Sequence, residues 1–201
     1  MDSSNFFDIN DTSHLTWGKN LPHWHQDNKY AFITFRLSDS LPQVKLQEYQ
    51  AEKEQWLKRH PSPWDEKTKL EYTSKFAKII DSWLDNGYGS CLLGDPANRK
   101  IVEEAFHFYD NKKYELVAFV VMPNHVHLLV QLYENHDINS TIRSLKSYTA
   151  KLIKKNGTTL EHIWQSESYD RIIRNEDHFM KVISYIFSNN RKLAWVKPWT
   201  W

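Results

Sequence analysis

Two apolar runs separated by a Pro-Asn break constrain the fold of this chain more than any other feature. The runs span 114–122 and 125–132, and branched and apolar residues predominate in both. Such runs predict strands, and the break between them predicts a tight turn, so we expect a β-hairpin. Successive side chains of a strand point to opposite faces. His125 and His127 therefore share one face of the second strand, and the apolar residues that alternate with them share the other.

Two imidazoles on one strand face, beside a turn, suit a divalent metal ion. The alternative is a pair of hydrogen-bonding histidines in a half-buried strand. A second His-x-His pair, His23 and His25, follows Pro22. No alternating pattern surrounds that pair, and the proline favours an extended loop. We therefore assign metal binding to His125 and His127.

Composition narrows the class of protein. The 201 residues suffice for one domain with a substantial core, so we expect a single domain over 1–201. The 26 basic and 25 acidic side chains nearly balance, so any basic surface must come from local clustering. Cys91 is the only cysteine, which excludes an internal disulfide and a cysteine-based zinc site and fits a reducing cytoplasm. No run approaches the roughly 18 apolar residues of a membrane span, and no signal peptide is evident, so we expect no membrane partner.

The remaining elements follow from periodicity and capping residues. Residues 1–28 are polar and irregular and predict a loose N-terminal arm, whereas 30–37 is rich in β-branched and aromatic residues and predicts a buried strand. The segment 161–174 predicts a loop and strand whose polar groups could converge on a site. Five helices are expected, at 40–60, from Ser62-Pro63 to about Gly87, at 95–110, at 137–156 and after Asn175.

The helix predicted at 137–156 carries a tyrosine at the edge of its apolar stripe. Projected at ~100° per residue, Tyr148 lies roughly 80° from the centre of the stripe, with Lys151 and Lys155 on the same side. A tyrosine there usually packs in an interface, but the two lysines favour contact with a phosphate. Attack of its hydroxyl on a phosphodiester would give a phosphotyrosine, which conserves the bond energy for rejoining. With a free pKa of about 10, the hydroxyl would need help from the lysines or a metal.

The sequence Met-Pro-Asn-His-Val-His-Leu-Leu-Val around His125 resembles the HUH motif of single-tyrosine transposases. More closely, the chain resembles the REP-associated tyrosine transposases, which are tied to repetitive extragenic palindromes in bacterial genomes. Further matching stretches lie at 32–42, 145–150 and 163–170. The resemblance covers most of the chain.

The resemblance implies an α+β, RRM/ferredoxin-like fold: a central antiparallel sheet with helices on one side, and an inserted helical pair at 43–88. It implies metal-dependent cleavage and rejoining of single-stranded DNA after recognition of a hairpin or palindrome, in the bacterial cytoplasm at the nucleoid. Relatives often act as homodimers, sometimes with the tyrosine helix serving the partner's metal site. Whether the site is built in cis or in trans stays open at this point.

By position, the resemblance assigns Mg²⁺ or Mn²⁺ to His125 and His127 and makes Tyr148 the nucleophile that keeps a 5′-phosphate. The third ligand of relatives can lie one turn after the tyrosine, which is Leu152 here and cannot ligate. Gln165 or Glu167 could replace it, and we prefer Glu167 for its charge. A salt bridge from Glu167 to a nearby arginine is the alternative. The predicted DNA contacts are Asn124, Lys146, Lys151, Lys155, Arg171 and Arg174.

Two other functions remain open. A domesticated relative would bind palindromic DNA hairpins without productive cleavage. A metal-dependent hydrolase would use water for attack and leave Tyr148 without a chemical role.

Overall fold

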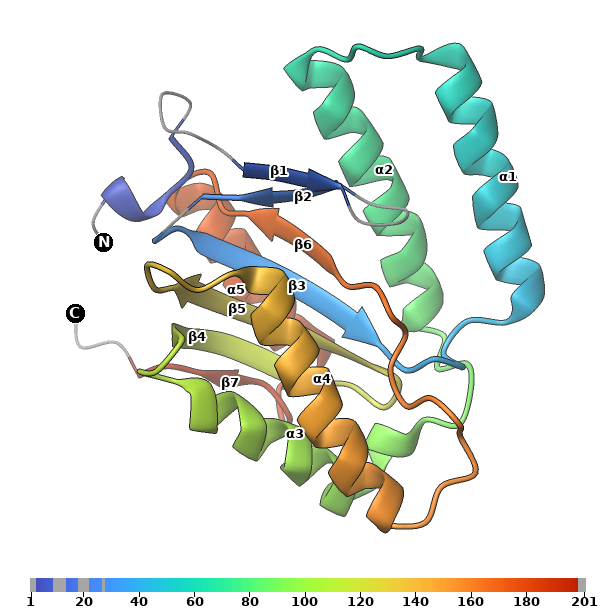
Figure 1. The fold of residues 1–201 in the computed structure, drawn as a ribbon, viewed down its shortest axis with the longest axis vertical. Helices are drawn as coiled ribbons and strands as arrows, with labels where there is room; N and C mark the ends of the chain where they lie inside the picture. The colour runs from blue at the N-terminus through green and yellow to red at the C-terminus, as the bar shows by residue number, and fades with distance from the viewer. Residues whose placement is uncertain (1–2, 9–13, 18–21, 27, 199–201) are drawn as a thin grey trace.

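A five-stranded antiparallel sheet forms the centre of the computed structural model, which describes residues 3–8, 14–17, 22–26 and 28–198. The strands lie in the order β6-β3-β5-β4-β7, and each neighbouring pair is antiparallel. Their bounds are β3 (Tyr30–Arg36), β4 (Tyr114–Val121), β5 (His125–Leu132), β6 (Tyr169–Ile172) and β7 (Trp195–Val196). The predicted hairpin is β4–β5, and the predicted α+β class is confirmed. The histidine-bearing strand β5 occupies the middle of the sheet (Figure 1).

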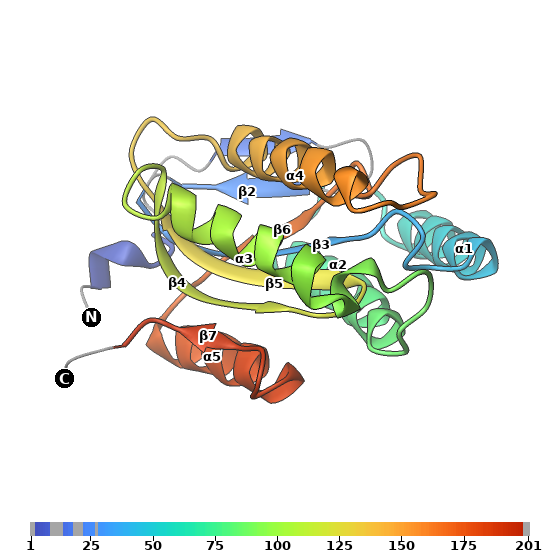
Figure 2. The ribbon, with the colours of Figure 1, turned by 90° about the horizontal axis from the view of Figure 1, so that it is seen from below.

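Helices cover both faces of the sheet (Figure 2). The helices α3 (Pro96–Tyr109) and α4 (Ile138–Lys155) pack on the face that carries Val126 and Leu128. The helix α5 (Glu176–Asn189) packs on the opposite face, the face of Leu129. The expectation of helices on one side was therefore wrong. The second face is apolar as well, and the apolar stripe of α5 removes it from water.

Capping residues explain where α4 and α5 begin. The Asp137 side chain accepts a hydrogen bond from the Ser140 backbone at the start of α4. The Asn175 side chain accepts one from the His178 backbone at the start of α5. Such caps satisfy backbone donors that have no partner within the helix. The predicted starts of both helices are confirmed.

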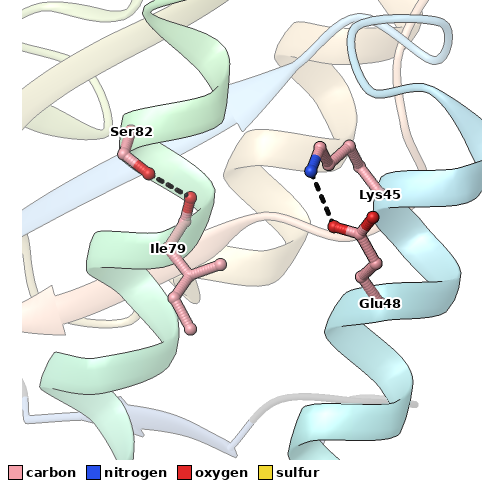
Figure 3. A network of polar contacts seen from close by, with 4 residues as sticks. All are labelled: Lys45, Glu48, Ile79 and Ser82. Carbon is pink, nitrogen blue, oxygen red and sulfur yellow. Dashed lines mark hydrogen bonds and ion pairs between the residues drawn. The ribbon is translucent and has the colours of Figure 1, made fainter.

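The inserted pair consists of α1 (Gln43–Arg59) and α2 (Glu66–Leu84), which lie side by side beyond one end of the sheet (Figure 1). The aromatic side chains of Trp56, Tyr72 and Phe76 form a core between them. Local contacts include the Lys45–Glu48 ion pair on α1 and the Ser82 hydroxyl bonded to the Ile79 carbonyl on α2 (Figure 3).

The start of α2 differs from the prediction at Ser62-Pro63. Asp65 caps this helix by accepting a hydrogen bond from the Thr68 backbone, and a carboxylate there also favours the helix dipole. The helix ends at Leu84, shortly before Gly87, whose φ of 67° suits the end of a helix.

The described part of the N-terminal arm contains structure that was not expected. After a short 3₁₀ helix, η1 (Ser3–Asn5), the strands β1 (His14–Trp17) and β2 (Pro22–His25) pair in an antiparallel hairpin. The expectation of a loose arm was wrong for these two segments, because their backbones satisfy each other by pairing. The other residues of the arm, 1–2, 9–13, 18–21 and 27, lie outside the described residues. Within the described ranges, none of the helices combines the length and apolar character needed to cross a membrane.

Candidate functional site

The two histidines of β5 point at each other in the protein interior. Their Nε2 atoms lie 3.1 Å apart. His125 is 1% exposed and His127 is fully buried. By strand alternation the pair lies on the sheet face of Leu129, which is the face that α5 covers.

Protein groups hold the other nitrogen of each ring. Nδ1 of His125 lies 2.8 Å from Oδ1 of Asn124, and Nδ1 of His127 lies 2.8 Å from Oγ1 of Thr34. Thr34 is opposite His127 in the β3–β5 register, so strand pairing brings these two groups together. Phe32 stacks on the His127 ring with centroids 5.4 Å apart. Both Nε2 atoms are consequently directed to one point.

Burial keeps both imidazoles neutral. It lowers the pKa of His125 to about 4, and it lowers the pKa of His127 well below its usual value. The positive charge of Arg171 lowers the pKa of His127 further. Neutral imidazole is the form that binds a metal ion. The uncharged pair is thus ready to ligate at neutral pH.

The separation of the nitrogens fits a shared ion. Two nitrogens about 2.1 Å from one ion lie about 3.0 Å apart when the angle at the ion is ~90°. Mg²⁺ prefers an all-oxygen shell, so Mn²⁺ suits two imidazoles better. Among the described residues, no group of three His, Cys, Asp or Glu side chains converges to hold a metal. A third ligand from the described residues would therefore be another kind of group, such as a side-chain amide.

A tyrosine that the sequence analysis did not select lies next to the pair. The hydroxyl of Tyr185 on α5 is 3.3 Å from Nε2 of His127, and the two rings meet edge to face. Burial raises the pKa of Tyr185, and the charge of Asp81 raises it further. Asn189 lies one turn later, and its amide nitrogen donates to the Tyr185 carbonyl. Tyr185 follows Val182 by three positions, a spacing that could have placed it near the sheet-facing stripe of α5.

Two further charged groups border the site. Arg171 of β6 stands opposite Phe32 in the sheet, with its guanidinium 5.0 Å from the Phe32 ring. Its Nε is buried and has no hydrogen-bond partner in the described part of the chain. Asp81 comes from α2, and burial raises its pKa to about 6, while Arg171 lowers it. Arg171 therefore lies near the histidine pair, and its DNA contact stays a prediction. The inserted pair contributes an acidic group nearby.

Tyr148 lies on the other side of the sheet. It belongs to α4, and its side chain is 53% exposed. The helix packs on the sheet face opposite the histidines (Figure 2). Lys151 and Lys155 are exposed on the same helix. A cleft of about 630 Å³ lies between α4 and the segment 161–168, and neither histidine lines it. Within one chain, the sheet separates Tyr148 from the histidine pair.

Lys146 and Glu167 interact with other groups of the protein. Lys146 is 9% exposed, and its ammonium donates to the carbonyls of Gln165, Ser166 and Glu167 at 3.1, 3.3 and 2.9 Å. It fixes a loop, and we propose that it has this structural role in place of the predicted DNA contact. The Glu167 carboxylate interacts with cations: it raises the pKa values of Lys53 and Lys146, which burial lowers. Among the described residues it completes no group of three His, Cys, Asp or Glu, and its role as third ligand stays a prediction.

The last two predicted DNA contacts have different environments. Asn124 is 1% exposed, and both ends of its amide bond to protein groups, so we propose a structural role for it in place of the predicted DNA contact. Arg174 is exposed just after β6, close to His178. Its DNA contact stays a prediction.

Comparisons with known proteins show which families the chain is similar to. The family model described as "Transposase IS200 like" matches residues 90–189, which include both histidines and Tyr185. A REP-associated tyrosine transposase of Escherichia coli (strain K12) is 31% identical over 88 residues, covering 43% of this chain and 50% of that protein. A putative REP-associated tyrosine transposase of Haemophilus influenzae is 35% identical over 95 residues, covering 42% of this chain and 53% of that protein.

The chain thus spans about half the length of the curated relatives that it matches. A solved structure of a REP-associated tyrosine transposase bound to a REP hairpin covers 87% of this chain and 74% of its own, with 17% identity and a TM-score of 0.49. The resemblance found in the sequence is confirmed by the family and sequence matches. The chain is similar to REP-associated tyrosine transposases over about half of their length, and its residues 90–189 match the IS200-like transposase family.

Proposed function

We propose that this chain cleaves and rejoins single-stranded DNA through a 5′-phosphotyrosine on Tyr185. The observation that carries the proposal is the 3.3 Å separation between the Tyr185 hydroxyl and Nε2 of His127. A nucleophile beside two neutral, convergent imidazoles is the arrangement that metal-assisted attack on a phosphodiester needs. Tyr185 takes the role first predicted for Tyr148.

His125 and His127 would hold the metal ion, Mn²⁺ or Mg²⁺. When bound, the ion would polarise a phosphate oxygen and orient the scissile phosphate. Asn189 is the candidate for the third ligand, because it lies one turn after Tyr185, where relatives place that ligand. Its amide oxygen is also a donor type that Mn²⁺ and Mg²⁺ accept.

The chemical step balances on the residues of this chain and the DNA. The Tyr185 oxygen bonds to phosphorus, the bond from phosphorus to the 3′ oxygen breaks, and that oxygen takes up a proton. The phenolic proton leaves to solvent. Because burial raises the pKa of Tyr185, positive charge must favour the phenolate, and Arg171 lowers the pKa of this tyrosine. Attack by a 3′ hydroxyl on the phosphotyrosine reverses the step and rejoins DNA.

We infer that the substrate is hairpin or palindromic DNA. One solved relative is bound to a REP hairpin, and the names of the curated relatives refer to the same palindromes. A homodimer and a location in the cytoplasm at the nucleoid also stay predictions.

A denaturing gel tests the proposal. The protein is incubated with Mn²⁺ and a single-stranded hairpin from beside its own gene, labelled at the 3′ end because the phosphotyrosine keeps that fragment. We expect a labelled band at the mass of protein plus DNA, absent with chelator and with Tyr185→Phe. Tyr148→Phe is the matched control and should keep the band.

Each alternative predicts a different gel. Loss of the adduct in Tyr148→Phe, with retention in Tyr185→Phe, would assign the nucleophile to α4 acting on a second chain. Cleavage in multiple turnovers without any adduct would indicate a hydrolase. Strong binding without cleavage would indicate a palindrome-binding protein.

A further inference from the structure

The side-chain amide of Asn124 is oriented by the end of the inserted helical pair. Its Nδ2 donates to the carbonyls of Leu84 and Tyr88, each at 3.2 Å. Leu84 is the last residue of α2, and Tyr88 follows in the connection to α3. Rotating the amide by half a turn would set its oxygen against two carbonyl oxygens. The two acceptors therefore determine which end of the amide is nitrogen.

This orientation directs the amide oxygen at His125. Oδ1 of Asn124 lies 2.8 Å from Nδ1 of His125. An amide oxygen only accepts hydrogen bonds, so Nδ1 must carry the proton. In a neutral imidazole the other nitrogen then has the free lone pair. His125 is thus held in the tautomer whose Nε2 can ligate.

His127 has a partner that does not fix its tautomer. The Thr34 hydroxyl, 2.8 Å from its Nδ1, can either donate or accept. Because Nε2 of His125 has the lone pair, the 3.1 Å contact between the rings requires Nε2 of His127 to carry the proton when no metal is bound. Nδ1 of His127 then accepts from Thr34.

We propose that Asn124 is a positioning residue that locks His125 in its metal-ligating tautomer, with the end of α2 as its anchor, while Thr34 lets His127 change tautomer when metal binds. If a metal ion were bound, His127 would release its Nε2 proton to solvent and take up one from solvent at Nδ1, and the Thr34 hydroxyl would accept from Nδ1 instead of donating to it. The inserted pair is thereby part of the metal site without contributing a ligand. This inference rests on the proposed function only for the metal itself.

Nitrogen NMR of the imidazole rings in the metal-free wild-type protein is the first test. We expect opposite tautomers, with the proton on Nδ1 of His125 and on Nε2 of His127. Addition of Zn²⁺ as a diamagnetic probe should convert His127 to the Nδ1–H form and leave His125 unchanged. A proton on Nε2 of His125 in the metal-free protein would overturn the proposal, and this result needs no variant.

Two substitutions separate the hydrogen-bond acceptor from the anchor. Asn124→Leu removes both, and we expect Mn²⁺ affinity, measured by calorimetry, to fall about 10- to 100-fold. Asn124→Asp keeps an acceptor for Nδ1–H, so it should keep the tautomer and bind Mn²⁺ more tightly than Asn124→Leu. Circular dichroism confirms that each variant is folded.

The outcomes distinguish this proposal from the function it rests on. Equal Mn²⁺ affinity in wild type and folded Asn124→Leu would contradict the role of Asn124. A wild-type protein that shows the expected tautomers but binds no Mn²⁺ would instead contradict the proposed metal-dependent function.

Discussion

The hydroxyl of Tyr185 lies 3.3 Å from Nε2 of His127, although 58 positions separate the two residues in the chain. Because α5 and β5 of one chain provide both groups, we infer that the proposed nucleophile and histidines act in cis. We predict that an inactive Tyr185→Phe protein mixed with an inactive His127→Ala protein stays inactive, since neither chain has both groups. The phosphotyrosine adduct on a denaturing gel is the readout.

Wild-type protein mixed with either variant is the control and should retain the adduct. An adduct restored in the mixture of the two variants would show that the tyrosine serves a partner chain. That result would revise the cis arrangement without changing the nucleophile.

The buried histidines predict a loss of stability in acid. The folded pKa of His125 is about 4, below its ordinary value of 6.5, so the unfolded chain binds more protons between these values. The stabilisation is complete above pH 6.5 and is lost as pH falls toward 4. With chelator present, we expect His125 alone to lower the free energy of unfolding by about 2 kcal/mol between pH 7 and 4.5. Urea denaturation at each pH measures it.

His125→Gln should have a smaller pH slope than wild type. His162→Gln is the matched control, because the His162 side chain is 78% exposed. Equal slopes for wild type and His125→Gln would contradict the role of burial.

Most elements of the fold could be predicted from the sequence, because the residues that determine them are neighbours in the chain. The Pro-Asn break predicted the β4–β5 hairpin, and side-chain caps at Asp137 and Asn175 predicted the starts of α4 and α5. The sequence did not predict which face of the sheet each helix covers. An apolar stripe shows that a helix packs, but not which face of a sheet it packs on.

The part of the candidate site that lies on a single strand could be predicted from the sequence. Alternation along β5 placed His125 and His127 on one face, and the structure agrees. Tyr185 was missed because its proximity to His127 depends on which face α5 covers. Tyr148 was selected on its neighbouring lysines, yet α4 carries it to the other face. The role of Asn124 depends on the end of α2, 40 positions earlier, which no local pattern indicates.

Arg171 is predicted to contact a DNA phosphate at the site. Its buried Nε has no partner in the described residues, and it lies close enough to His127 to lower the pKa of that residue. Arg171→Gln should reduce the rate of adduct formation roughly tenfold or more, because a charge-assisted contact is lost. The dependence of DNA affinity on salt should weaken by about one phosphate contact. Fluorescence anisotropy across a salt series measures the second effect.

Lys100→Gln removes an exposed positive charge from α3, on the opposite face of the sheet, and is the control for adduct formation. We expect its rate to equal that of wild type. Equal rates for Arg171→Gln and wild type would remove Arg171 from the phosphate-binding group.

Lys146 is predicted to stabilise the fold instead of binding DNA. Its ammonium donates to three carbonyls of the segment 165–167, and burial lowers its pKa to about 8, so it is still mostly charged at pH 7. Lys146→Met keeps the aliphatic chain but leaves these carbonyls without their donor. We expect a loss of about 1–3 kcal/mol in the free energy of unfolding, measured by urea denaturation at pH 7.

Lys151→Met, on the exposed side of the same helix, should change stability by no more than about 0.5 kcal/mol. If Lys146→Met were as stable as Lys151→Met, the three bonds would contribute nothing net, and the cost of burying the ammonium would offset them. A clear difference between the two variants would establish that α4 holds the loop through this one side chain. The loop joins α4 to β6, so the same contact supports the strand that carries Arg171.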